Sequence, residues 1–159
     1  TFVGKPVVRP TARSPGAGRG PVPGRTGLYH VAIHLPNEKE FARVLARIAA
    51  AGLPQAPTDH IFSKATYLSD PDGIQLEFTL ETPERAGEIT VGPASVTIRD
   101  ASGRLRGMTE PLDVREVLSH LTDRDLDRRL PNRTTVGQEH LHVADLNSTV
   151  RYVHAVNRR

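Results

Sequence analysis

The order of hydrophobic patterns over residues 28–80 constrains the fold of this chain more than any other feature. Residues 28–35 (LYHVAIHL) alternate between apolar and other side chains, which predicts a β-strand. An amphipathic helix of about four turns should follow between Asn37 and Gly52, because apolar residues recur there at helical spacing. Shorter extended segments come next, at 60–63, 65–69 and 74–80. This order predicts an α+β unit in which the helix covers one face of a sheet.

Four segments are expected along the chain. Residues 1–26 hold five Gly and five Pro residues without apolar periodicity, so they are predicted to be flexible. Residues 27–82 form the α+β unit, and residues 83–136 form a connector with a short helix. Residues 137–159 begin with another alternating strand and continue as a helix capped by Asp145. The sequence therefore predicts a βαβββ unit followed by the βα start of a second one.

Charge and composition narrow the classes of partner. The net charge of +3 originates in residues 1–26, which carry five basic residues and no acidic one, so no predicted helix or sheet face forms a basic stripe. We therefore expect no nucleic-acid partner. Neither a bilayer-spanning apolar run nor a signal peptide is recognisable, so we expect no membrane partner and a cytoplasmic location. The absence of Cys excludes disulfides and thiolate ligands.

The strand alternation also places two candidate metal ligands together. In the first strand the apolar residues should face the helix, so His30 points to the opposite, open face of the sheet. The same argument on the last strand of the unit puts Glu77 on that open face. Imidazole and carboxylate are ligands that suit Fe(II). The alternative is that both are ordinary polar residues on the solvated face of a sheet.

Several motifs in this region resemble the vicinal-oxygen-chelate superfamily, which includes glyoxalases, bleomycin-resistance proteins and extradiol dioxygenases. LYHVAI, DH, YLSDPDG and the glutamate of QLEF come in the order and spacing of that family, and are most similar to its two-domain catechol-2,3-dioxygenase-like members. The resemblance covers residues 26–80 and continues more weakly through 130–146. Two departures stand out, because Ile74 and Gln75 replace the usual Asn and Gly, and Gln138 replaces a leading His.

The resemblance implies a curved mixed sheet that forms half of a cup around a divalent metal, Fe(II) or Mn(II). By position, His30 and Glu77 would be metal ligands, and His60 of the DH motif would be a catalytic acid–base group near the substrate. It further implies extradiol cleavage of a small aromatic, vicinal-oxygen substrate. A homodimer, or modules outside this sequence, would complete the cup.

Two other interpretations remain open at this stage. The chain could be an inactive or partner-dependent fragment, since a full preceding module and the strands after residue 159 are not seen. It could also be a non-catalytic module of the bleomycin-resistance type, although such proteins use aromatic walls and this chain has no Trp. Metal content and ligand binding would separate these alternatives.

Overall fold

A computed structural model describes residues 27–91, 96–122 and 126–143. The expected segment 1–26 and the expected helix after Asp145 lie outside these ranges. The βαβββ order is confirmed, and its elements are β1 Gly27–His34, α1 Glu38–Ala50, β2 Ala56–Asp59, β3 Ser63–Ser69 and β4 Gln75–Glu81. Among the described residues, no helix has the length and apolar character needed to cross a bilayer.

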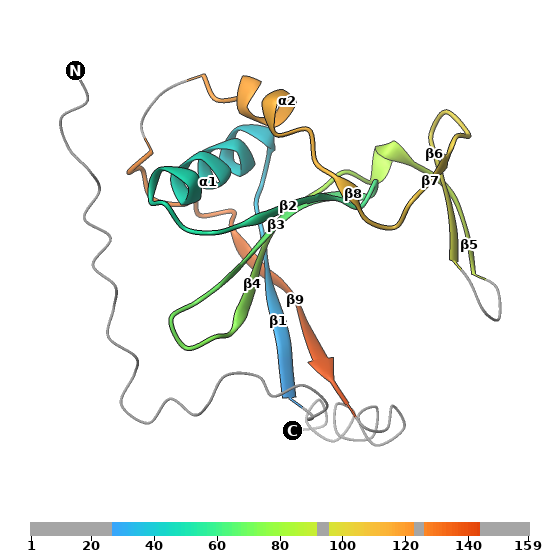
Figure 1. Cartoon of the computed structure of the whole chain (residues 1–159). Helices are drawn as coiled ribbons and strands as arrows, with labels where there is room; N and C mark the ends of the chain where they lie inside the picture. Colours follow the sequence, from blue (N-terminus) through green and yellow to red (C-terminus); the bar gives the residue numbers. More distant parts are fainter. Residues whose placement is uncertain (1–26, 92–95, 123–125, 144–159) are drawn as a thin grey trace.

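The main sheet has six strands in the order β8-β2-β3-β4-β1-β9. β1 and β4 run parallel, because α1 and two further strands separate them along the chain, and the other neighbours are antiparallel. β8 is the short strand Glu110–Pro111, and β9 spans Thr135–His142. The fold is therefore α+β, as the hydrophobic pattern predicted. Its sheet is mixed, as the family resemblance implied. In Figure 1, β1 and β9 extend side by side away from the helices.

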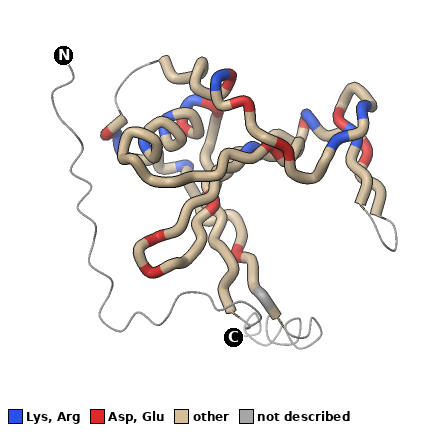
Figure 2. Tube along the Cα trace, in the orientation of Figure 1, with Lys and Arg blue, Asp and Glu red and all other residues tan. Residues whose placement is uncertain are grey.

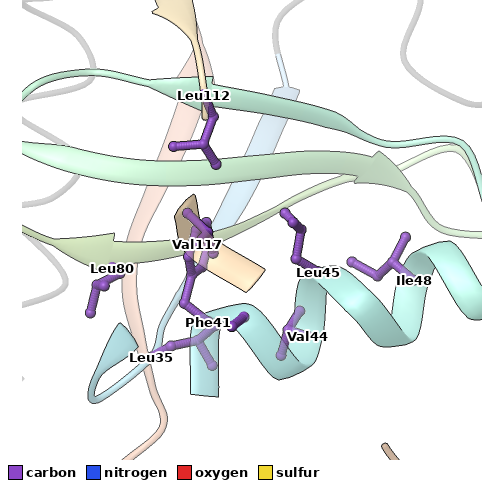
Figure 3. Packing of buried hydrophobic residues seen from close by; sticks show 9 residues of the cluster. Leu35, Phe41, Val44, Leu45, Ile48, Leu80, Leu112 and Val117 are labelled. Carbon is purple, nitrogen blue, oxygen red and sulfur yellow. The ribbon is translucent and has the colours of Figure 1, made fainter. Parts of the chain in front are cut away.

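Helix α1 forms the main contact with the sheet. The Asn37 side chain caps it by accepting a 3.0 Å hydrogen bond from the Glu40 amide, and Gly52 follows its end at a φ of +67°. A second helix, α2 (Val114–Ser119), packs against α1. Figure 3 shows the apolar side chains gathered between the helices and the strands. The core residues it labels are Leu35, Phe41, Val44, Leu45, Ile48, Leu80, Leu112 and Val117.

A separate three-stranded sheet projects from the body of the molecule (Figure 1), and we call residues 86–106 the arm. It follows the 3₁₀ turn η1 (Pro83–Arg85) and consists of β5 Ala86–Val91, β6 Val96–Asp100 and β7 Leu105–Arg106. The chain then returns through residues 107–109 to β8, which pairs with β2 in the main sheet. The root of the arm therefore lies next to the end of β2.

Two sequence-based expectations were wrong. No strand spans 60–63; β2 ends at Asp59, because the chain turns at Ile61, whose φ is +71°. The first strand also does not divide cleanly into a helix-facing apolar side and a solvated polar side. Tyr29 is 42% exposed, whereas His30 and Glu77 are each only 4% exposed. The face that was expected to be open is therefore buried at these residues. Tyr67 of β3 and His140 of β9 pack their rings against His30.

Candidate metal and acid–base site

His30 and Glu77 come together on neighbouring parallel strands. In the β1–β4 register Glu77 lies opposite Ala32, two residues from His30, so both side chains point to one face. His30 Nε2 is 3.0 Å from Glu77 Oε2, and the two side chains are 6% and 5% exposed. The placement expected from strand alternation is thus observed, as a close and buried pair.

One ring nitrogen of His30 is available for a further ligand. Both nitrogens are buried, and among the described residues Nδ1 has no hydrogen-bond partner, whereas Nε2 contacts the Glu77 carboxylate. Burial lowers the pKa of His30, and the neighbouring His140 lowers it further, while Glu77 acts in the opposite direction. A buried imidazole that stays neutral keeps the lone pair that a metal ion requires.

His140 adds a second imidazole beside this pair. It lies directly opposite His30 in the β1–β9 register, and the two ring centroids are 4.1 Å apart. Sequence reasoning assigned it no role, although the alternation in EHLHVA already indicated a strand. Among the described residues, however, no three His, Cys, Asp or Glu side chains converge into a group that could hold a metal ion. His30 and Glu77 are thus two candidate donors, with no third one converging on them among the described residues.

Tyr67 links Glu77 to His60. Tyr67 lies opposite Glu77 in the β3–β4 register and hydrogen-bonds it, and its hydroxyl is 2.9 Å from His60 Nε2. Burial and then the negative charge of Glu77 raise the pKa of Tyr67, so the phenol keeps its proton. Sequence reasoning missed Tyr67, because only the observed strand register shows that YLSDPDG brings it beside Glu77.

The proton count limits how this chain of groups can be arranged. His60 Nδ1 is 2.8 Å from the Met108 carbonyl oxygen, which can only accept, so Nδ1 carries a proton. Tyr67 has a single hydroxyl proton, which it donates either to His60 Nε2 or to the Glu77 carboxylate. In the second arrangement His60 must itself donate from Nε2 and is an imidazolium. Chemically, the group can therefore take up or release one proton at His60 Nε2 through Tyr67.

The chain is similar in sequence to a known protein family and to a curated relative. The sequence profile of the Glyoxalase/Bleomycin resistance protein/Dioxygenase superfamily matches residues 4–78. A curated relative, catechol-2,3-dioxygenase from Bacillus subtilis (strain 168), is 36% identical over 146 residues. The match covers 92% of this chain and 47% of the relative, so the chain spans about half the length of the relative. No solved structure matches the chain significantly.

Proposed function

From its membership of the glyoxalase/bleomycin-resistance/dioxygenase superfamily, we propose that this chain contributes a metal-dependent, extradiol ring-cleaving site that acts on small aromatic diols. The observation that carries the proposal is the buried His30–Glu77 pair, in which His30 Nδ1 has no hydrogen-bond partner among the described residues. Burying polar groups without a partner is costly, so such a pair is typical of a site built for a ligand.

The donor set fits a divalent metal. An imidazole nitrogen and a carboxylate oxygen, His30 Nε2 and Glu77 Oε2, lie 3.0 Å apart and are both buried, so these two residues would hold the ion. One imidazole with one carboxylate suits Fe(II) or Mn(II), and the chain has no thiolate to favour a softer ion. When bound, such an ion would supply a Lewis acid that orients the two diol oxygens and activates dioxygen.

The remaining residues of the site handle protons. Tyr67 keeps its proton and donates it to His60 Nε2 while that imidazole is neutral, or to the Glu77 carboxylate once His60 is an imidazolium. His60 Nε2 is the group that accepts a diol proton, either directly or through the Tyr67 hydroxyl, and returns it to the product. We thus assign His30 and Glu77 as metal ligands and His60 as the acid–base residue.

A third protein ligand has to come from elsewhere, since two donors leave the ion poorly held. His140 needs only a change of side-chain conformation to join the pair, because its ring already contacts His30. Alternatively, a second copy of the chain in a homodimer, or a further module as in the longer relative, supplies the ligand and closes the cup. Sedimentation at several protein concentrations, with and without metal, distinguishes an ion bound within one chain from an ion shared by two.

The test is the metal content of two matched variants. The protein loaded with Fe(II) under anaerobic conditions, then desalted, should retain metal in stoichiometric amount, whereas Glu77→Gln should lose it. Glu81→Gln is the control, because Glu81 lies on the same strand, is half exposed, and has its carboxylate 3.6 Å from His34 Nε2. Equal metal retention by both variants would refute the assignment of Glu77. Saturable binding of catechol to the metal-free protein, together with no metal uptake, would instead indicate a non-catalytic binding module.

A further inference from the structure

We propose that the Arg106–Glu110 ion pair at the root of the arm is a positioning device that fixes which nitrogen of His60 carries the proton. The pair acts through the Met108 carbonyl oxygen and does not touch the metal ligands. Only the catalytic consequence of this positioning rests on the proposed function. The effect of the ion pair on the His60 tautomer can be tested without metal or substrate.

The ring of His60 is held at both nitrogens by groups of different kinds. Nδ1 faces the Met108 carbonyl oxygen at 2.8 Å, and Nε2 faces the Tyr67 hydroxyl at 2.9 Å. A carbonyl oxygen cannot donate, so Nδ1 remains protonated whether His60 is neutral or charged. Proton exchange is thereby confined to Nε2, the nitrogen that faces Tyr67, which in turn hydrogen-bonds Glu77.

The Met108 carbonyl owes its position to a short closed turn between β7 and β8. Arg106 Nη2 is 2.6 Å from Glu110 Oε2, and the Gly107 amide donates a 2.7 Å hydrogen bond to Glu110 Oε1. Glu110 therefore closes the turn from both sides of Met108. Hydrogen bonds from Arg106 and then from the Gly107 amide hold the pKa of Glu110 down at about 2, so the carboxylate stays charged.

The same ion pair is connected to the backbone that carries His60. Glu110 on β8 lies opposite Asp59 on β2, so Met108 and His60 approach each other across paired strands. Arg106 also bonds Asp100 on the arm at 3.2 Å, and its charge acts on Asp59. Figure 2 shows blue and red segments alternating around the root of the arm. The arm thus joins the main sheet beside His60 through charged contacts.

The experiment measures the tautomer of His60 directly. Protein labelled with ¹⁵N-histidine is examined by long-range ¹H–¹⁵N correlation at mildly alkaline pH, and His60→Gln identifies the His60 signals. We expect the Nδ1–H form in the wild-type chain, although a histidine in water favours the Nε2–H form. In Arg106→Met the ratio of the two forms should move toward Nε2–H by about fivefold, the amount that one hydrogen bond supplies.

Matched variants distinguish a specific effect on the His60 tautomer from a general loss of structure. Arg106→Lys keeps the charge beside Glu110 and should restore most of the Nδ1–H form. Arg99→Met removes an exposed arginine of the same arm, whose guanidinium bonds the Gly103 carbonyl, and should leave the tautomer unchanged. If Arg106→Met loosens the whole arm, Glu110→Gln is used, because it keeps the side-chain shape and removes the charge.

Failure of this inference and failure of the proposed function give different results. An Nε2–H tautomer in the wild-type chain, or an Nδ1–H tautomer unchanged in both Arg106→Met and Glu110→Gln, would overturn the inference. If the tautomer responds as expected while no metal binds, the proposed function fails and the positioning role stands. In an active holoenzyme, Arg106→Met should lower kcat and alter its pH profile more than it changes KM.

Discussion

Ile61 is the most strained residue described in the fold. Its φ of +71° is unusual for a β-branched side chain, and such conformations cost about 1–3 kcal/mol. Asp59 compensates by accepting the Ile61 amide at 2.8 Å, and Arg85 holds Asp59 through bonds of 2.6 and 3.1 Å. The strained turn is what directs the following chain back into β3 and leaves His60 facing Tyr67.

We therefore predict that Asp59→Ala lowers the free energy of unfolding by about 1–3 kcal/mol, since it leaves the Ile61 amide and Arg85 without their acceptor. Urea denaturation followed by circular dichroism measures the change. The control is Asp127→Ala, an exposed aspartate, which should alter stability by less than about 0.5 kcal/mol. Equal stability of the two variants would show that the Asp59 contacts do not hold the turn.

The same carboxylate predicts a dependence of stability on pH. Burial would raise the pKa of Asp59, but the hydrogen bonds from Arg85 and the Ile61 amide outweigh it, and the pKa is lowered below 3.8. The contribution of Asp59 is thus present above about pH 4 and lost as the pH falls toward the folded-state pKa. Unfolding free energies measured between pH 5 and 3 should fall less steeply for Asp59→Asn than for the wild-type chain. Parallel curves would contradict this.

At the scale of elements, helix α2 is held by apolar packing and by a charged contact. Val117 is fully buried in the core beside α1. Lys64 of β3 is nearly buried and lies 3.0 Å from Glu38 of α1 and 3.0 Å from Glu116 of α2. Burial alone would lower the pKa of Lys64, but these two carboxylates raise it instead, so the ammonium group stays charged and joins the two helices to the sheet.

Neighbouring residues of α2 provide a direct test of this packing. Val117→Ala should lower the free energy of unfolding by about 1–3 kcal/mol, because it removes buried methyl groups and leaves a cavity. Leu118→Ala changes the next residue, which is 37% exposed, and should cost clearly less. Both values come from thermal unfolding of the same preparation. A larger loss for Leu118→Ala would show that α2 uses a different face.

The elements differ in how well the sequence predicted them. β1, α1 and β4 were recognised because apolar side chains recur regularly along each of them, so the periodicity is visible in the local sequence. β2 was misplaced, because the turn at Ile61 depends on Asp59 and Arg85 and not on hydrophobic pattern. The two-residue strands β7 and β8 are too short to show a periodicity, and they are defined by pairing, β7 with the preceding β6 and β8 with the distant β2.

The residues of the candidate site also differ in how well the sequence predicted them. His30 and Glu77 were predicted to share a face, because alternation determines the direction of a side chain from each strand alone. Tyr67 and His140 were missed, because their proximity depends on the register between strands, which the sequence does not reveal. The role of Met108 is invisible in the sequence, since it acts through a backbone carbonyl.

For the molecule as a whole, the site depends on the complete sheet. Its side chains come from β1, β3, β4 and β9, and the first and last of these strands are separated by about a hundred residues along the chain. In the unfolded chain these groups are far apart, so a metal ion would bind them much more weakly. Metal binding and the folding of the sheet are therefore expected to be coupled.

This coupling predicts that Mn(II) stabilises the fold. A ligand at about 100 times its dissociation constant adds about 2.7 kcal/mol to the free energy of unfolding, which corresponds to a rise in Tm of about 5–10 °C for a chain of this size. Differential scanning calorimetry with increasing Mn(II) should show the rise in the wild-type chain and in Glu81→Gln, with reversal by a chelator. Glu77→Gln should show none, because one of the two buried donors is weakened. A rise of the same size in Glu77→Gln would mean that Mn(II) binds elsewhere on the folded chain.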